Sequence, residues 1–386
     1  MKNVLRIFMV VMFVVFTSTA LLSATVHAEQ LTDNAYNDIN PQINSDGYMV
    51  WYGHDGNDYE IFLYDGTDMT QLTDNDYDDW SPWINDNGQV VWYGHDGNDY
   101  EIFLYDGTDT TQLTTNDDHD VQPRINDNGY VVWYGGVSGH QNVYLYDIAA
   151  ETTTDLTSAN SYDADSPQIS NDGYVVWAWK DVTGDYEIFL YDIAAETTTQ
   201  LSDTTYSEAD PQINNDGYIV WRGSPNDIEI FLYDIATEIT TQLTDNTYND
   251  LNARINDAGQ VVWQGYEGGA DYEIFLYDIA TETTITLTDN DSSDEYPRIN
   301  NAGQVVWYAY EDESDKEIFL FDGSLPIKQI TDNDYDDYYP RINDDGYVVW
   351  HGKAGIDDTS EIFLYGPKED DDDDDDGWCF INTVCK

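Results

Sequence analysis

Residues 82–114 read PWINDNGQVVWYGHDGNDYEIFLYDGTDTTQLT, and this stretch decides the fold because similar copies recur along the chain. The tryptophan that ends each Gly-x-Val-Val-Trp-type segment marks the repeat, and successive tryptophans lie 41, 41, 44, 44, 42, 44 and 43 residues apart. A period of 40 to 45 residues with several short strands per unit is typical of a β-propeller blade. The eight markers are Trp51, Trp92, Trp133, Trp177, Trp221, Trp263, Trp307 and Trp350.

Each repeat contains four predicted strands, which in the quoted copy are residues 82–85, 90–93, 101–105 and 111–114. Val, Ile, Tyr, Phe, Trp and Thr dominate these segments, as expected for strands. The second and third strands are apolar at nearly every position, which is typical of a sheet covered on both faces. Gly88 ends the turn between the first two strands, where a short hairpin needs a residue with positive φ.

The first and last copies of the repeat are complementary. Residues 30–32 read as a fourth strand with no first three strands before them, whereas the last copy ends at residues 361–365 without a fourth strand. Pairing these two segments would remove an open sheet edge. We therefore predict an all-β fold, an eight-bladed β-propeller of four-stranded antiparallel blades over residues 29–367, closed by the N-terminal strand. The alternative, an open solenoid, would normally need atypical capping repeats, and none is visible.

The two ends of the chain differ from the repeats. Residues 1–28 have a basic start, an apolar run and a small-residue cleavage site, so we predict a signal peptide and an exported protein that is periplasmic, extracellular or on the cell surface. A retained membrane anchor is the alternative, and no later stretch is apolar enough to span a bilayer. Residues 368–386 form a predicted disordered acidic tail. Its Cys379 and Cys385 suggest a local disulfide, or a processing or attachment signal.

The repeat motif Pro-x-Ile-Asn-x-x-Gly-x-Val-Val-Trp, followed by Glu-Ile-Phe-Leu-Tyr-Asp and Gln-Leu-Thr, resembles the TolB-type (WD40-like) propeller repeat. The resemblance covers all eight units. Asn mostly replaces the Ser that follows the first strand in that family, and the next Pro is missing. Members of the family act in envelope protein complexes, as gating domains of peptidases and in polysaccharide lyases, so the resemblance implies a fold more strongly than an activity.

The charge of the chain excludes several partners. Lys and Arg total 13 and Asp and Glu total 77, which gives a formal net charge of −64. Nucleic acids and anionic membranes need a basic surface, so we expect neither as a partner. No nucleophile elbow, phosphate loop, dinucleotide fingerprint or zincin motif is present.

Acidic loops between the fourth and first strands suggest calcium ligands. Carboxylates at alternate positions with amide oxygens between them suit Ca²⁺, although the loops are not EF-hands. Solubility and turn formation by Asp and Asn are the alternative explanation. The candidate ligands are Asp74, Asp76, Asp78, Asp79, Asp332, Asp334, Asp336 and Asp337.

Four arginines share one repeat position in the innermost strand, at the predicted central channel: Arg124, Arg254, Arg298 and Arg341. An aspartate precedes each by a few residues, so we expect a structural Arg–Asp network. An anion site in the channel is the alternative. His54 and His95, which occupy equivalent loop positions, are further candidates for ligand binding, and with His119 for a transition metal.

The near identity of the repeats favours a protein without an active site, because catalysis needs one blade to differ. The leading prediction is therefore a secreted, non-enzymatic binding or scaffold propeller. Its acidic loop face, with Tyr77 and Trp80, would contact a protein or a glycan. The alternative is a carbohydrate-active enzyme, a polysaccharide lyase or hydrolase, that uses carboxylates or histidines of that face.

Overall fold

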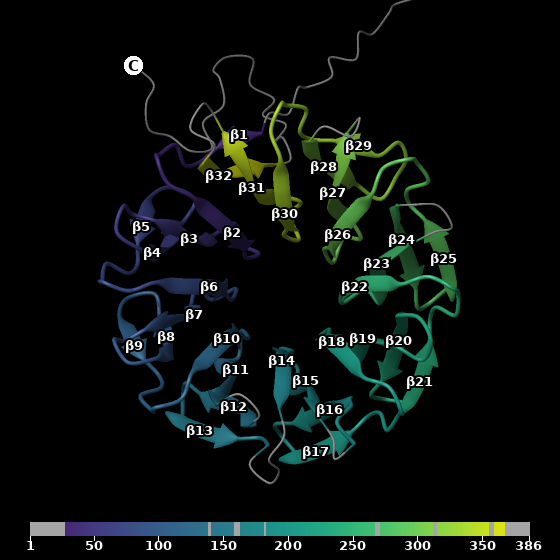
Figure 1. Ribbon diagram of the computed structural model, residues 1–386, viewed down its shortest axis with the longest axis horizontal. Helices are drawn as coiled ribbons and strands as arrows, with labels where there is room; N and C mark the ends of the chain where they lie inside the picture. The colour runs from purple at the N-terminus through teal and green to yellow at the C-terminus, as the bar shows by residue number, and fades with distance from the viewer. Residues whose placement is uncertain are drawn as a thin grey trace, which may run out of the picture.

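Eight four-stranded antiparallel sheets surround a common axis in the computed structural model (Figure 1). The structure describes residues 28–137, 140–157, 163–180, 183–266, 271–311, 315–354 and 359–366. The predicted eight-bladed propeller is confirmed. The predicted signal peptide, apart from Ala28, and the predicted acidic tail with both cysteines lie outside the described residues.

Each blade runs from an inner strand at the axis to an outer strand at the rim, and blades 1 to 7 follow the chain in order. The strands of blades 1 to 4 are β2 Asp38–Ile43, β3 Met49–His54, β4 Tyr59–Tyr64 and β5 Met69–Gln71; β6 Asp79–Ile84, β7 Val90–His95, β8 Tyr100–Tyr105 and β9 Thr110–Gln112; β10 Asp120–Ile125, β11 Tyr130–Val137, β12 His140–Asp147 and β13 Thr152–Asp155; β14 Ala164–Ile169, β15 Tyr174–Lys180, β16 Tyr186–Asp192 and β17 Thr197–Gln200. Those of blades 5 to 8 are β18 Glu208–Ile213, β19 Tyr218–Gly223, β20 Glu229–Asp234 and β21 Ile239–Gln242; β22 Asp250–Ile255, β23 Gln260–Tyr266, β24 Tyr272–Asp278 and β25 Thr283–Thr286; β26 Asp294–Ile299, β27 Val305–Glu311, β28 Asp315–Phe321 and β29 Lys328–Gln329; β30 Asp337–Ile342, β31 Val348–Ala354, β32 Thr359–Tyr365 and β1 Glu29–Gln30.

The N-terminal strand completes blade 8, as the sequence predicts. Glu29 pairs with Leu364 and Gln30 with Phe363 in antiparallel register. Thr32 extends the contact, because its hydroxyl donates to Glu361 Oε2 at 2.6 Å and accepts the Ile362 N–H at 2.9 Å. The predicted closing segment, residues 30–32, is therefore in place, although the regular ladder covers only residues 29–30.

The hydrophobic core lies between blades. Val50, Ile61 and Leu63 of blade 1 pack against Val90 and Trp92 of blade 2, and corresponding clusters recur around the ring. The last of these clusters joins Met49 and Trp51 of blade 1 to Val349 and Ile362 of blade 8. Both faces of the second and third strands are thus buried, which explains why those strands are apolar at almost every position.

The repeated tryptophan is fixed by an aspartate at the start of the inner strand. Trp92 Nε1 donates to Asp79 Oδ1 at 3.1 Å, and the same bond recurs in blades 1, 3, 6, 7 and 8. A buried indole N–H needs such an acceptor. In blade 4 the aspartate position is Ala164, and the indole nitrogen of Trp177 is buried without a hydrogen-bond partner.

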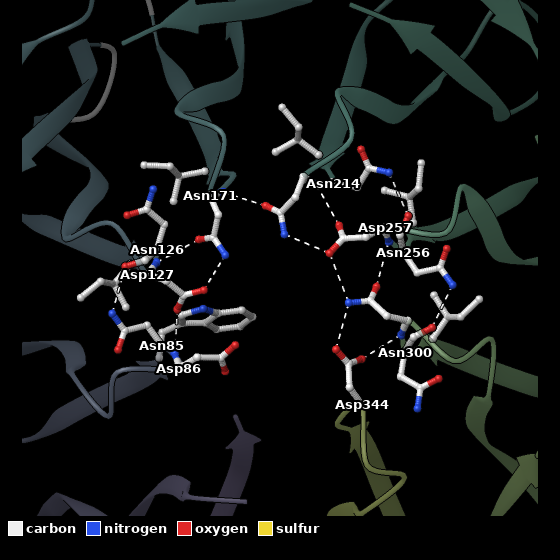
Figure 2. Close-up of a pocket in the computed structure, with 18 of the residues that line it drawn as sticks. Asn85, Asp86, Asn126, Asp127, Asn171, Asn214, Asn256, Asp257, Asn300 and Asp344 are labelled. Carbon is white, nitrogen blue, oxygen red and sulfur yellow. Dashed lines mark hydrogen bonds between the residues drawn. The ribbon is translucent and has the colours of Figure 1, made fainter. Parts of the chain in front are cut away.

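Asparagine side chains link successive blades at the turns between the first and second strands (Figure 2). The side-chain amide of Asn85 donates to the backbone carbonyl of Asn126 in the next blade at 2.9 Å. The equivalent bonds run from Asn44, Asn126, Asn214, Asn256, Asn300 and Asn343. We call these asparagines the asparagine belt. Together with adjacent turn residues it lines a cavity of about 320 Å³ at this end of the central channel.

Every inner strand contains a β-bulge. In blade 3 the register shifts between Val121 and Arg124, and Gln122 adopts a φ of 52°. A bulge adds one residue to a strand and reverses which face the following side chains occupy. Asp120 and Arg124, four positions apart, therefore do not share a face as they would in a regular strand.

No helix is present in the described part of the chain, and none there could cross a membrane.

Candidate active site

Blades 7 and 8 differ from the others on the face opposite the asparagine belt. The residue that follows the repeated tryptophan is Tyr308 in blade 7 and His351 in blade 8, and five polar or aromatic side chains surround this pair. We call the seven residues the blade 7–8 cluster: Glu295, Tyr296, Tyr308, Lys316, Tyr338, Tyr339 and His351. They come from the first halves of β26, β28 and β30 and from the middle of β27 and β31.

Tyr308 is the centre of this cluster. It is 2% exposed, and its ring centroid lies 5.4 Å from that of Tyr296 and 5.7 to 5.8 Å from those of Tyr338 and Tyr339. The Lys316 ammonium lies 4.5 Å from the centroid of Tyr308 and 4.9 Å from that of Tyr338. An ammonium over two aromatic faces is attracted by both rings.

Glu295 is the carboxylate of the cluster. The hydroxyl of Tyr308 donates to its Oε2 at 3.2 Å. Burial, and then the nearby charge of Glu295, raise the pKa of Tyr308 above its ordinary value, so the phenol stays protonated and remains a donor. Glu295 itself is half-buried, so its carboxylate is fixed by Tyr308 and still borders solvent.

His351 is neutral and oriented. Burial, with a smaller contribution from Arg341, lowers the pKa of His351 to about 4. Its Nδ1 accepts the backbone N–H of Asn40 from blade 1 at 3.3 Å. Since a neutral imidazole has one protonated nitrogen, the proton is on Nε2. The ring packs on Tyr338 and Tyr339, at centroid distances of 5.9 and 5.6 Å.

The four arginines of the inner strands do not form the expected Arg–Asp network. In the described residues no ion pair joins them to an aspartate, and their guanidinium groups donate mainly to the carbonyl of the preceding residue. Arg341 also donates to Gln42 Oε1 at 3.0 Å. The bulge explains the difference, because it turns the arginines away from the aspartates, which bind tryptophans instead. Burial, and then neighbouring arginines, lower the pKa of Arg341 to about 9.

The predicted calcium ligands are not gathered as the sequence suggests. Asp79 and Asp337 are buried, and each accepts one bond from a tryptophan and one from an asparagine. Asp78 and Asp336 accept the backbone N–H groups of Tyr59 and Lys316, at the start of the third strand of the preceding blade. The other four, Asp74, Asp76, Asp332 and Asp334, are exposed. Of the eight, only Asp74 belongs to a described carboxylate group compact enough for one ion, with Asp55 and Glu60. The calcium assignment stays a prediction.

His54 and His95 form separate local contacts rather than one site. Each Nδ1 accepts a backbone N–H of its own loop at 3.0 Å, from Gly56 and Gly97 respectively. His119 likewise accepts the Tyr100 N–H. Among the described residues, no compact group of possible metal ligands contains a histidine.

Tyr77 and Trp80, the predicted aromatic contacts, lie near the boundary of blades 1 and 2. Tyr77 packs on His95 with ring centroids 5.0 Å apart and lines an open cavity of about 510 Å³ with Asp58, Asp76, Asp78 and Tyr100. Trp80 packs against Tyr52 and Tyr59 at 5.0 and 4.6 Å. Trp80 is therefore part of an aromatic group at the boundary of blades 1 and 2.

The sequence analysis did not identify Glu295, Tyr308 or Lys316. The column of residues that follows the repeated tryptophan gives a signal for His351 but none for Tyr308, because Tyr also occupies it in blades 1 to 3. This column reads Tyr52, Tyr93, Tyr134, Ala178, Arg222, Gln264, Tyr308 and His351. The residues that all repeats share define the fold, whereas this column varies from blade to blade.

Comparison with known proteins supports the fold without naming a family. No family description matches the sequence, and no curated protein matches it. A solved oligogalacturonate lyase in complex with manganese is similar, with a TM-score of 0.57 and 13% identity over 90% of this chain and 99% of that one. The β-propeller domain of the Trilobed protease from Pyrococcus furiosus has a TM-score of 0.54 and 12% identity, covering 75% of this chain and 95% of that one. Porphyromonas gingivalis dipeptidyl peptidase 4 has a TM-score of 0.60 and 11% identity over 82% of this chain.

These similar structures correct the leading functional prediction. Most of them are peptidases or oligogalacturonate lyases, which favours the enzyme alternative over a non-enzymatic scaffold. The prediction treated the blades as equivalent, whereas their side chains on this face differ: blades 7 and 8 bring Glu295, Lys316 and His351 together with several tyrosines. Identities of 11 to 14% establish the fold alone. This chain spans 56% of the dipeptidyl peptidase but almost the full length of the lyase.

Proposed function

We propose that this protein is a carbohydrate-active enzyme, a lyase that cleaves an acidic glycan by β-elimination at the blade 7–8 cluster. The observation that supports this most is the arrangement around Tyr308, whose hydroxyl binds Glu295 while the Lys316 ammonium lies over its ring. The likeness over nearly the full length of an oligogalacturonate lyase supports the same class of substrate.

The residue types favour elimination over hydrolysis. Glycoside hydrolysis usually needs two carboxyl groups that flank the bond, and the cluster contains one. Elimination from a uronate needs a base for the proton next to the sugar carboxylate and a cation that neutralises that carboxylate. Glu295 supplies the base and Lys316 the cation, so both requirements are met within the cluster.

The reaction follows from these roles. The glycan stacks on the half-buried rings of Tyr338 and Tyr339. Lys316 binds the uronate carboxylate, and Glu295 removes the proton from the adjacent carbon. The electron pair forms a carbon–carbon double bond as the glycosidic carbon–oxygen bond breaks, and Glu295 returns the proton to the leaving oxygen. Tyr308 is a positioning residue, because it fixes the carboxylate of Glu295 through its hydroxyl.

The cluster does not fit the manganese named for the similar lyase. Its only metal-ligating types are Glu295 and His351, and the Nδ1 of His351 is occupied by the Asn40 N–H. We therefore derive no step through a metal.

Two expectations from the sequence remain proposals. Residues 1–28 support export, which would bring the enzyme to extracellular or envelope glycans. The repeat motif supports a relationship with TolB-type propellers.

The test is the appearance of an unsaturated uronate product. The protein is incubated with pectic, alginate and glycosaminoglycan oligosaccharides, and the ultraviolet absorbance of the new double bond is followed. Glu295→Gln and Lys316→Met should each lower kcat/KM by roughly 100-fold or more, as expected for loss of a base or of charge stabilisation. Glu238→Gln and Lys328→Met, at exposed positions on outer strands and turns, are the matched controls.

A separate measurement distinguishes the positioning role of Tyr308. Tyr308→Phe keeps the ring beneath Lys316 but removes the hydrogen bond that positions Glu295, so kcat should fall while KM stays close to that of the wild type. No product from any uronate glycan, or full activity in Glu295→Gln, would refute the proposal.

A further inference from the structure

Three carboxylates converge where the β7–β8 loop enters β8. Asp96, Asp99 and Glu101 each bring an oxygen within 4.8 Å of the others. Asp96 is exposed, whereas Asp99 is 6% exposed and Glu101 is fully buried. The group therefore extends from solvent into the interior of the blade.

Glu101 is the observation that points to a ligand. Both of its carboxylate oxygens are buried without a hydrogen-bond partner. The equivalent glutamates of blades 1, 5, 6 and 7 each accept a backbone N–H from an asparagine of the following loop, at 2.8 to 3.1 Å. A buried carboxylate is costly unless it is paired, and the side chain of Thr114 offsets only part of this cost for Glu101. Both oxygens of Glu101 are therefore available to a cation.

Asp99 and Asp96 complete the arrangement. Asp99 Oδ1 is also buried without a hydrogen-bond partner. Asp96 Oδ1 accepts the Asn98 N–H at 2.9 Å, which fixes the loop, and its exposed side leaves room for water. Three unpartnered oxygens from two buried carboxylates, with a third carboxylate at the entrance, are the donors that a hard divalent cation prefers.

We propose that Asp96, Asp99 and Glu101 bind a calcium ion that ties the β7–β8 loop to blade 2. Calcium suits the site better than magnesium, because it accepts irregular sets of carboxylate and water oxygens, whereas magnesium demands a near-ideal octahedron. Its residues are not among the eight aspartates named as candidate ligands from the sequence, and the site does not depend on the proposed lyase activity.

Calcium must compete with protons for the carboxylates of this site. Burial raises the pKa of Glu101 to about 7; the side chain of Thr114 opposes this, and the charges of Asp120, Asp99 and Asp96 add to it. The pKa of Asp99 is raised as well, by burial and then by Asp96, while His119 and His95 oppose this. Calcium affinity is therefore measured at pH 8, where the carboxylates are ionised.

The experiment is calorimetric titration of the full chain with Ca²⁺ after chelation, together with its melting temperature. We expect Glu101→Gln to weaken calcium binding at this site at least tenfold and to lower the number of bound ions by one. Asn142 occupies the equivalent position in blade 3, so an amide is compatible with the fold there. Glu273→Gln, the matched buried glutamate of blade 6, should bind calcium as the wild type does.

A second variant protects the test against misfolding. Asp96→Asn changes an exposed loop residue and should weaken binding without altering the melting temperature of the calcium-free protein. Binding must also raise the melting temperature of the wild type, because calcium would stabilise the folded state. The proposal is overturned if the wild type gives neither heat nor thermal shift, if Glu101→Gln and Asp96→Asn bind as tightly as the wild type, or if Mg²⁺ binds as tightly as Ca²⁺.

Discussion

The side-chain amide of Asn343 donates a hydrogen bond to the backbone carbonyl of Asn44, 3.1 Å away and 299 residues earlier in the chain. This bond joins blade 8 to blade 1 at the end of the molecule opposite the candidate active site. It also accounts for the recurrence of Asn at this position of the repeat, because the side-chain amide reaches the backbone carbonyl of the next blade.

Removing this link should lower stability. Asn343→Ala leaves the carbonyl of Asn44 with the Gly47 N–H as its only donor among the described residues, and it removes the acceptor of the Tyr347 N–H. We expect a loss of roughly 1–3 kcal/mol in the free energy of unfolding, the usual cost of an unpaired buried polar group, measured by chemical denaturation.

Ser170 provides the converse test, because it occupies the belt position in blade 4 and no described bond joins its side chain to Asn214. Ser170→Asn should supply that bond and raise stability by about 0.5–1.5 kcal/mol. Equal stability of Asn343→Ala and the wild type would show that the belt contributes nothing.

The contribution of the closing strand to stability should also be measurable. Deleting residues 29–33 exposes the edge of β32 and should lower the melting temperature and cause aggregation, followed by light scattering. Thr32→Val is the subtler variant, because it preserves shape while removing the two hydroxyl bonds to Glu361 and Ile362. We expect it to cost roughly 1–3 kcal/mol. Thr110→Val, on an exposed outer strand, should be neutral, and an unchanged melt of the deletion variant would contradict closure.

Stability should fall as the pH rises from 5 to 8 in the presence of a chelator. Burial raises the pKa of Asp38 and Asp337 from 3.8 to about 6, that of Asp294 to about 7, and that of Glu317 from 4.5 to about 7. Between about pH 4 and pH 7 the folded protein therefore keeps protons that the unfolded chain has released. These groups contribute full stability below the unfolded pKa values, and the contribution is lost as the pH rises through the folded ones.

At acid pH the stability of the folded protein depends on aspartates in the loops. Backbone N–H donors lower the pKa of Asp65, and Lys328 lowers that of Asp322, so both lose their stabilising contribution as the pH falls below about 4. Denaturation curves between pH 3 and 9 should thus give a maximum near pH 4 to 6. Glu317→Gln should flatten the alkaline limb whereas the exposed Glu238→Gln should not, and a profile that rises steadily to pH 8 would contradict the assignment.

The fold was predictable because its signals lie within one repeat or between its two ends. The positions of Gly88 and Trp92 recur in every unit, and residues 30–32 have no other blade to complete. The asparagine belt was not predictable in the same way. Asn85 looks like a turn residue until its partner, the carbonyl of Asn126 in the next blade, is known.

The candidate sites were harder to predict because neighbouring residues have different surroundings. Asp78 and Asp79 are adjacent and both acidic, yet Asp78 accepts the Tyr59 N–H of the preceding blade and Asp79 is buried and accepts the indole N–H of Trp92. The positive φ of Gln122 marks a bulge that places Asp120 and Arg124 on opposite faces of the inner strand. The predicted pairing of Asp120 with Arg124 was wrong for this reason. The residues of the blade 7–8 cluster lie in five strands, so no local sequence motif predicts that they meet.

The pairing of Glu29 with Leu364 means that the two ends of the folded body are neighbours in space. A short linker between them would make the backbone continuous, and new termini could then be opened in any loop that connects an outer strand to the next inner strand. Such a circular permutant, cut for instance within residues 201–207, would build every blade from one uninterrupted stretch of chain. The order in which the blades are read along the gene is thus separable from the ring that they form.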